Sequence, residues 1–381
     1  MELALVVSRT DPEARALRSA VARRYLPNRI CAYAHPDRPT THPLLAGKGA
    51  VDGKAALYVC RNFSCLQPVT DPAQVETLLD GRAGVTEPAG NAASKILGGE
   101  RLPGSATPEG TARFAARKIH PSHGGATLEQ GFGAFGRTGL TTSRLGFGTY
   151  RVDRRESEHR AALVKAIQAG CNLIDTSTNY MDGESERLVG SVLAELVRTG
   201  ELRRDEIIVV SKIGYVQGQN LTQAMAREKA GKPYPDMVKY GEGIWHCIHP
   251  DFLADQLAQS LDRLGLTTLD VCLLHNPEYF LSWSSQQGGG HLTESRARFY
   301  ERLQRAFEYF ERQVQEGRLR WFGVSSNTVA SPAADADATS VSGMLAAAQA
   351  AAGRMGVPAH HFAVLQSPMN LYEAGPVRVA N

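Results

Sequence analysis

Short apolar runs alternate with longer amphipathic stretches over the second half of the chain. The runs are RLGFGTYR (144–151), CNLID (171–175), EIIVVSK (206–212), LDVCLLH (269–275), RWFGVSS (320–326) and HFAVLQS (361–367). Between them, apolar residues recur three and four positions apart, which predicts helices over 157–170, 184–196, 251–264, 294–315 and 342–354. Short, continuously apolar strands are typical of a parallel sheet covered on both faces. The pattern therefore predicts an α/β fold, either a doubly wound sheet or a (β/α) barrel.

The first 80 residues follow a different pattern. ELALVV, RICAYAH and AALYVC read as short strands, and a helix is expected over 12–24. We expect this small α+β segment to have a marginal core, because so few elements bury little apolar surface. Residues 81–134 are rich in Gly, Ala, Pro and Ser with almost no apolar periodicity, which predicts a connector. The expected organisation is thus a segment 1–80, a linker 81–134 and an α/β domain 135–381.

Composition and charge exclude several classes of protein. Forty-two Lys and Arg against 39 Asp and Glu give a net charge of +3, too small to indicate a nucleic-acid or anionic-membrane partner. There is no apolar run long enough to span a bilayer, and the first residues lack the pattern of a secretory signal. The six cysteines are scattered, which fits a reducing cytoplasm. Oligomeric state cannot be read from these features.

Polar residues follow the apolar runs at the carboxyl end of nearly every predicted strand. They include Asp175, Lys212 and His275, and Tyr180 follows Asp175 by five positions. Each alone is more often a helix cap, a solvated residue or a rim side chain. Their coincidence at successive strand ends indicates an active site, since barrel enzymes carry their chemistry there.

These four residue types suit proton transfer to a carbonyl. A phenol is a poor acid at pH 7, so we expect the Lys212 ammonium to lower the pKa of Tyr180 and Asp175 to orient Lys212. His275 would orient the carbonyl oxygen or share the proton. A cofactor must supply the hydride. The sequence contains no strand-linked GxGxxG motif, so a nicotinamide would bind in the barrel mouth, and no metal-ligand spacing is present.

Five motifs in order resemble the aldo-keto reductases. They are GFGTYRV, GCNLIDTSTNYMDGESERLVG, IIVVSKIG, LDVCLLHNPE and GRLRWFGVSSN, within a match from about residue 135 to LQSPMNL. The resemblance implies a (β/α)8 TIM barrel and a reductase that interconverts aldehydes or ketones with alcohols using NADPH or NADH. It places the family's Asp-Tyr-Lys-His tetrad on Asp175, Tyr180, Lys212 and His275.

The same resemblance implies further contacts. Ser326 and Asn327 would hold the nicotinamide carboxamide, with Gln366, Gly148, Thr149 and Asp175 completing the cofactor site. The extra Ser325 leaves the register of the Ser-Asn pair open. Tyr150, Asn276 and Trp245 are candidates for the substrate pocket.

Two departures from the family pattern affect the expected function. A long insertion follows Lys212, and its Tyr240, Trp245 and His246 either close over substrate or form a rim without catalytic contact. The family's last two strands are missing after HFAVLQS, so we expect a C-terminally incomplete barrel of about six strands from a truncated frame. The alternative to a working reductase is therefore a catalytically impaired nucleotide-binding or fusion-fragment protein.

Residues 1–80 resemble the carboxyl tail of the spermatogenesis-associated thioredoxin-domain family. The segment HPLLAGKGAVDGKAALYVCRNFSCLQPVTDPAQVETLL carries this resemblance. Cys60 and Cys65 are separated by four residues and lack the CxxC spacing of redox motifs. Structural or incidental thiols are expected here, ahead of a redox or metal role.

Overall fold

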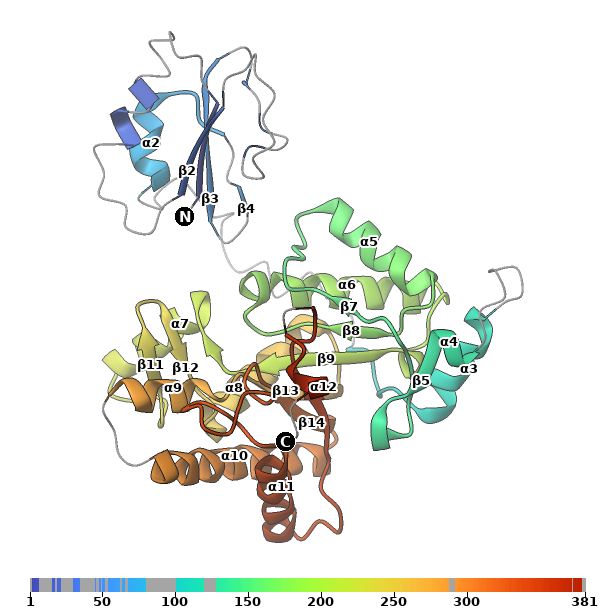
Figure 1. Ribbon diagram of the computed structural model, residues 1–381. Coiled ribbons are helices and arrows are strands. Elements are labelled where there is room, and N and C mark those ends of the chain that lie inside the picture. Colours follow the sequence, from blue (N-terminus) through green and yellow to red (C-terminus); the bar gives the residue numbers. More distant parts are fainter. Residues whose placement is uncertain are drawn as a thin grey trace. The chain divides into compact units, whose positions relative to one another are not determined.

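The computed structural model divides the chain into two compact units, Met1–Ile96 and Leu97–Asn381 (Figure 1). It describes residues 101–119, 128–287, 292–371 and 373–378, together with parts of the stretch 2–79. Each unit is considered by itself.

Unit 1 contains a small mixed sheet of strand order β2-β1-β3-β4. Its elements are β1 (Glu2–Val6), β2 (Ile30–Ala34), β3 (Ala56–Arg61), β4 (Ser64–Cys65) and the helix α2 (Pro72–Leu79). Strand β1 is parallel to β2 and antiparallel to β3. The three predicted strands and the α+β character are confirmed, whereas β4 and α2 were not predicted. The helix expected over 12–24 lies partly outside the described residues, although 16–17 and 19–21 are helical.

Unit 2 is built on a six-stranded, all-parallel sheet of order β15-β14-β13-β9-β8-β7. The strands are β7 (Phe147–Gly148), β8 (Leu173–Asp175), β9 (Ile208–Ile213), β13 (Leu269–His275), β14 (Leu319–Ser325) and β15 (Phe362–Gln366). The sheet does not close on itself within the described residues. All six predicted strands are present, although β7 is much shorter than its apolar run.

Alternation along the strands separates two apolar layers. Val209, Ile213, Cys272 and Leu274 belong to the large core shared with the helices. Ile208, Val210, Val271 and Leu273 form a second cluster with Ala106 and Leu140 on the other, inner face. Successive side chains of a strand point to opposite faces of the sheet. A strand residue therefore lies on the same face as the residues two positions before and after it.

Helices cover the outer face of this sheet (Figure 1). They are α5 (Ser157–Gln168), α6 (Glu184–Arg198), α8 (Pro250–Leu264), α10 (Leu292–Gln315) and α11 (Val341–Met355). The apolar positions predicted to face inward, such as Leu188, Leu257 and Phe307, are fully buried. Helices α8 and α11 end where Gly265 and Gly356 adopt left-handed backbone angles, φ 63° and 66°.

The connector prediction is wrong for residues 101–118, which belong to unit 2. Leu102 forms a parallel bridge with Leu266, and helix α3 (Pro108–Lys118) buries Phe114 completely. A Cβ at Gly110 would overlap the Asp205 carbonyl, so the glycine permits the close approach of α3. A short hairpin, β5 (Phe132–Ala134) with β6 (Thr141–Ser143), follows. The composition suggested a linker because small residues make many of the contacts of α3. Such residues produce no apolar periodicity in the sequence.

The insertion between β9 and α8 folds as a compact subdomain. It holds β10 (Tyr215–Val216), α7 (Gly218–Lys229), β11 (Val238–Gly241) and β12 (Ile244–His246), with sheet order β10-β12-β11. Val216 and Val238 are buried, so this small sheet is packed against the rest of unit 2.

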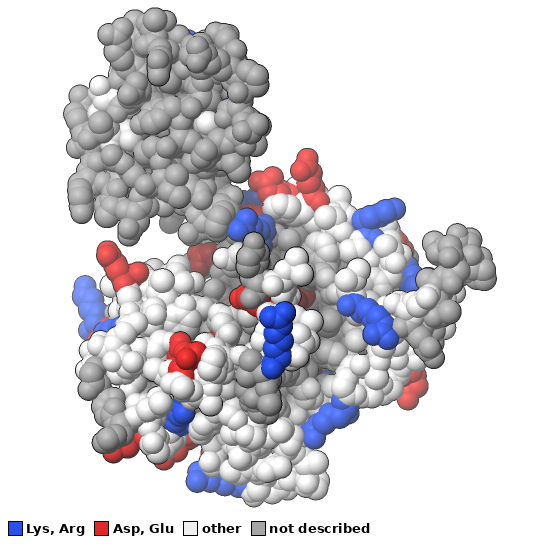
Figure 2. Space-filling view, in the orientation of Figure 1, with Lys and Arg blue, Asp and Glu red and all other residues white. Residues whose placement is uncertain are grey.

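Charged side chains are dispersed over the face of unit 2 drawn in Figure 2, without a large area of one sign. Among the helices in the described parts of the chain, there is none with the length and apolar character needed to cross a membrane.

Candidate active site

The tetrad predicted from the sequence lies on three neighbouring strands. Asp175, Lys212 and His275 stand at or next to the carboxyl ends of β8, β9 and β13, which are adjacent in the sheet. By alternation, Asp175 shares the inner face with Leu173, Lys212 with Val210 and His275 with Leu273. Parallel strands end at the same edge, so these side chains meet at one mouth.

Lys212 makes hydrogen bonds to two other residues of the tetrad, Asp175 and Tyr180. Its side chain is 1% exposed, and its ammonium donates to Asp175 Oδ2 at 2.7 Å, to the Thr176 carbonyl at 3.0 Å and to Tyr180 OH at 3.0 Å. An ammonium has three donors, so all its hydrogen bonds are made inside the protein. The buried charge is thereby aimed at the phenol.

A tight turn returns Tyr180 to the mouth. Tyr180 begins a 3-10 turn (η4, Tyr180–Gly183) in which Met181 and Asp182 have φ of 47° and 56°. Two successive non-glycine residues in the left-handed region store strain. The Asp182 carboxylate accepts the backbone N–H of Gln219 in α7, which helps to hold the turn. The curled loop expected after Asp175 is therefore present.

Burial shifts the pKa values of Tyr180 and Lys212. It raises the pKa of Tyr180 above its ordinary value, and the neighbouring Asp175 carboxylate raises it further. Burial lowers the pKa of Lys212, while Asp175 opposes that shift. The expected lowering of the phenol's pKa is therefore not seen in the free protein, because burial disfavours the phenolate. Tyr180 keeps its proton at neutral pH.

His275 is held from both sides. Its Nδ1 lies 3.1 Å from Ser177 Oγ, and its ring meets the Tyr215 ring edge-on at 4.7 Å between centroids. His246 Nε2, from the insertion, donates to the His275 carbonyl at 2.7 Å. Burial first, and then the Lys212 charge, lower the pKa of His275 well below its ordinary value. His275 is thus a neutral ring whose Nδ1 shares a hydrogen bond with the Ser177 hydroxyl.

The insertion therefore contacts His275 of the predicted tetrad. His246 is fully buried and stacks on Tyr279, and Tyr215 lies between His246 and His275. Of the two alternatives left open by the sequence, a rim that makes no contact with the tetrad does not agree with these distances. The insertion reaches His275 at its backbone carbonyl and at its ring.

Gly148 and Thr149 are proposed from the sequence for the cofactor; Gly148 is the last residue of β7, and Thr149 follows it. Gly148 is exposed, and a Cβ built there would meet no atom within 4 Å. Thr149 is fully buried, and its N–H and hydroxyl both donate to the Asp175 carbonyl, at 2.9 and 3.0 Å. Thr149 thus fixes the end of β7 against Asp175.

The Ser-Asn pair lies one position away from the inner face. Ser325 shares that face with Gly323, and its hydroxyl donates to Gln366 Oε1 at 3.0 Å. Ser326 is buried with its Oγ on Thr339 at 3.2 Å. The Asn327 side chain belongs to an exposed residue, while its N–H donates to Glu278 Oε1 at 2.7 Å. The structure therefore brings the side chain of Ser325, rather than that of Ser326, to the Gln366 side chain, while the Ser326 N–H donates to the Gln366 carbonyl at 2.9 Å.

The three candidates for the substrate pocket have different positions. The exposed Tyr150 ring meets the Tyr180 ring edge-on at 5.2 Å. Asn276 is buried directly after His275 with φ 51°. Trp245 precedes His246 on β12, so it lies on the opposite face of that strand, where the Lys239 ammonium sits 4.4 Å from its ring. Tyr150 therefore contacts the tetrad through the Tyr180 ring, whereas the contact given for Trp245 is with Lys239.

Glu278 is a buried mouth residue that the sequence reasoning missed. It lies two positions after Asn276, joins the loop after β13 to the loop after β14 through Asn327, and leaves its Oε2 without a partner. Burial raises the pKa of Glu278 to about 7. A carboxylate directly behind a buried strand, in HNPE, was the available signal.

Replacing Glu278 by glutamine is expected to stabilise the protein above pH 7. The pKa of Glu278 is raised from 4.5 to about 7 on folding, so its contribution to stability is present below pH 4.5 and is lost as pH rises through about 7. The difference between variant and parent should approach about 3 kcal/mol at pH 8 and fall below about 1 kcal/mol at pH 5. Urea unfolding at both pH values measures it, with Glu294→Gln, exposed at the start of α10, as the control. Equal differences at the two pH values would contradict the raised pKa.

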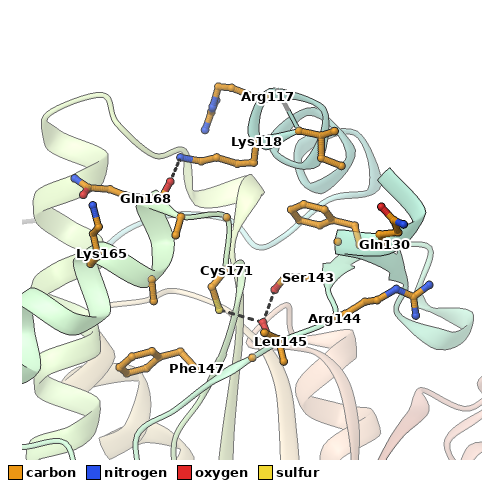
Figure 3. Close-up of a pocket in the computed structure, with 17 residues that line it drawn as sticks. Arg117, Lys118, Gln130, Ser143, Arg144, Leu145, Phe147, Lys165, Gln168 and Cys171 are labelled. Carbon is orange, nitrogen blue, oxygen red and sulfur yellow. Dashed lines mark hydrogen bonds between the residues drawn. The ribbon is translucent and has the colours of Figure 1, made fainter. Parts of the chain in front are cut away.

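A hollow lies at the opposite end of the strands from the tetrad. Leu145 and Gly146, which precede β7, and Cys171, which precedes β8, line it together with Lys118 (Figure 3). The Lys118 ammonium donates to the Gln168 carbonyl at 2.8 Å, and Cys171 Sγ to the Leu145 carbonyl at 3.3 Å. Barrel chemistry belongs to the carboxyl ends, so this hollow is not the active site.

The chain is similar in sequence to a known family and to several curated proteins. The aldo/keto reductase family model matches residues 144–346, more than half of the chain. The NADH-specific methylglyoxal reductase of Escherichia coli (strain K12) is 28% identical over 149 residues, covering 37% of this chain and 40% of that protein. The NADPH-dependent aldose reductase GRE3 of Saccharomyces cerevisiae (strain ATCC 204508 / S288c) is 23% identical over 202 residues, covering 49% and 50%. The solved structure of the thermostable aldo-keto reductase Tm1743 with the inhibitor epalrestat has a TM-score of 0.41 and 20% identity, covering 65% and 66%.

The chain belongs to the aldo/keto reductase family. Its six parallel strands are of that family's TIM-barrel type. The chain spans 40% to 50% of the length of the two curated relatives described above.

Proposed function

We propose that the protein is an NAD(P)H-dependent oxidoreductase that reduces aldehydes or ketones to alcohols, or catalyses the reverse reaction. The observation that supports it is the Lys212 ammonium, which joins Asp175 and the Tyr180 phenol at the mouth of the parallel sheet. A protonated phenol beside a buried cation is a general acid suited to a carbonyl oxygen.

The side chains at the mouth fit a nicotinamide cofactor, which supplies the hydride when bound. Asp175 Oδ1 and Thr176 Oγ1 are buried without a partner, so hydroxyl or amide groups of a ligand would satisfy them. Ser325 and Gln366 offer a hydroxyl and an amide on the inner face, with Ser326 and Asn327 in the same loop and Gly148 leaving space beside β7. One relative is NADH-specific and another NADPH-dependent, so NADH and NADPH both stay in the proposal.

In the reduction, Tyr180 gives its proton to the carbonyl oxygen as the carbonyl becomes an alcohol. The phenolate that remains is stabilised by the Lys212 ammonium 3.0 Å away, and Asp175 keeps that ammonium in place. The neutral His275 ring lies 5.9 Å from the Tyr180 ring and would orient the same oxygen. The mouth then needs one proton from solvent to restore Tyr180.

The reduction rate is expected to stay level as pH rises from about 7 to about 9, because the raised pKa of Tyr180 keeps the acid protonated there. Measuring kcat for an aldehyde across this range, with a check that activity returns on readjustment to pH 7, tests this. A reversible fall with a midpoint near neutrality would show that the phenol titrates lower than the site implies.

Turnover itself is tested by following absorbance at 340 nm with NADH or NADPH and a panel of aldehydes.

A second candidate is a nucleotide-binding protein without turnover, favoured by the edge strands β7 and β15, each of which has one neighbour in the described sheet. Quenching of nucleotide fluorescence without oxidation of the nucleotide would support the second candidate and contradict the first.

The family match does not extend to residues 1–80. We propose no activity for that segment from its resemblance to the tail of the spermatogenesis-associated thioredoxin-domain family, and that resemblance stays a prediction.

A further inference from the structure

The His246 side chain adds a hydrogen bond at the carboxyl ends of β9 and β13. The register of these two strands runs as far as Ile213 opposite Leu274. One position further, Gly214 follows β9 and His275 ends β13. At that position the His275 carbonyl accepts from His246 Nε2 at 2.7 Å. The imidazole therefore extends the connection between the two strands beyond their backbone ladder.

Gly214 leaves the space for this hydrogen bond. A Cβ at this position would lie 2.5 Å from the His275 carbonyl oxygen and 2.6 Å from His246 Nε2. The Gly214 carbonyl accepts from the Cys247 N–H at 2.9 Å. The next residue, Tyr215, pairs with His246 across β10 and β12. These backbone contacts hold β12, and with it the imidazole, at the end of β9.

The peptide group between His275 and Asn276 is held on both sides. Its C=O accepts from His246, and its N–H donates to the Ser325 carbonyl on β14 at 2.7 Å. Because a peptide group is planar, two hydrogen bonds on opposite sides fix its orientation. Asn276 has φ 51°, so the chain turns into the left-handed region directly after His275. Loss of the His246 donor would release one of the two constraints at this turn.

The chemistry of the His246 ring favours a donor role over simple packing. A carbonyl oxygen only accepts, so Nε2 carries the proton and Nδ1 does not. Within the described residues Nδ1 is buried without a partner, which is unfavourable. Burial lowers the pKa of His246 to about 4, so the ring is neutral at neutral pH. A phenyl ring could stack on Tyr279 in the same way and would bury no unpaired nitrogen. The hydrogen bond, rather than the stacking, therefore accounts for a histidine here.

We propose that His246 is a positioning residue, which holds the His275 carbonyl and so fixes the direction in which the His275 ring meets the carbonyl oxygen of the substrate. This role rests on the proposed reductase function and assigns a part in it to the insertion. His246 acts through His275, whose ring lies 5.9 Å from the Tyr180 ring. The Tyr215 ring also lies edge-on to both imidazoles, 5.8 Å from His246 and 4.7 Å from His275 between centroids.

Two variants of His246 separate the hydrogen bond from the packing. His246→Phe keeps a flat ring beside Tyr279 and removes the donor, whereas His246→Gln keeps an N–H donor. We expect His246→Phe to lower kcat for aldehyde reduction about 10-fold or more, since a misplacement of about 1 Å can cost about 10²-fold. The KM for the nucleotide should change little, and His246→Gln should recover most of the lost kcat. A parent rate in His246→Phe, or equal losses in the two variants, would overturn the proposal.

The matched control is His249→Asn in the same insertion. The His249 side chain caps α8 by accepting from the Asp251 N–H at 3.2 Å. Asparagine is a favoured capping residue, so the helix should keep its cap and kcat should stay at the parent value.

The histidine ring signals in NMR spectra of the full chain, prepared with isotope-labelled histidine, give a readout that does not depend on turnover. The His275 signals should move in His246→Phe and return toward their parent positions in His246→Gln. Unmoved His275 signals in His246→Phe would overturn the positioning role. A parent protein without turnover would contradict the proposed function, and the His275 signals would then decide the positioning of this ring by themselves.

Discussion

Replacement of Tyr180 by phenylalanine is expected to lower kcat for aldehyde reduction by about 10²–10⁴, the range that a positioned general acid contributes. The change removes only the hydroxyl, whose oxygen lies 3.0 Å from Lys212 Nζ. The ring contacts with Tyr150 and His275 stay possible, so nucleotide binding and the melting temperature should change little. Steady-state kinetics at saturating nucleotide measure the effect.

The matched control is Tyr309→Phe. Tyr309 lies on α10 in the outer layer, is 9% exposed and is also a phenol whose pKa burial raises. Its loss of a hydroxyl should leave kcat unchanged. If Tyr180→Phe turned over at the parent rate while Tyr309→Phe did too, the proton would have to come from another group and the proposed role of Tyr180 would be wrong.

The largest loss of stability is expected for Glu186→Gln. Glu186 on α6 is fully buried and accepts from Arg263 Nε at 2.6 Å, from Ser211 Oγ at 2.6 Å and from Ser260 Oγ. Glutamine keeps the shape but leaves the Arg263 guanidinium, whose side chain is 10% exposed, without its counter-charge. Breaking one partner of a buried ion pair costs about 3–5 kcal/mol. Urea unfolding at 25 °C measures the free energy of unfolding.

Glu184→Gln serves as the control on the same helix. Glu184 pairs with Arg154 at 3.0 Å and Arg187 at 3.3 Å, and the arginines are more than one-third exposed, so its loss should cost about 0–1 kcal/mol. Equal losses for the two variants would mean that the Glu186 network adds nothing beyond a surface pair.

Strand β13 is an example of an element whose bounds the sequence pattern predicts correctly. Its run Leu269–His275 matches the observed strand end to end, because Val271–Leu274 is continuously apolar, as expected for a strand buried on both faces. Helix α8 matches to within one residue, since its leucines and the terminal Gly265 mark both face and end. The positions of Asp175, Lys212 and His275 followed directly, because they are the last residues of their runs or next to the last.

Other features depend on contacts that a local pattern does not carry. Helix α3 is fixed by Gly110 against Asp205 and by the single buried Phe114, which leave no periodicity to read. The register of the Ser-Asn pair, which motif matching left open, depends on the alternation of side chains along β14, and that alternation places Ser325 on the same face as Gly323. The raised pKa of Tyr180 comes from burial, which the sequence alone does not measure.

The order of strands in the sheet also affects how easily each strand opens locally. Strands β8, β9 and β13 each have a hydrogen-bonded neighbour on both sides, whereas β7 and β15 have one. Local opening starts where a strand has the fewest partners. Transient fraying would therefore begin at the two rims and could proceed there while Lys212 and His275 keep their places. Asp175, Lys212 and His275 therefore stand on the strands that we expect to come apart last.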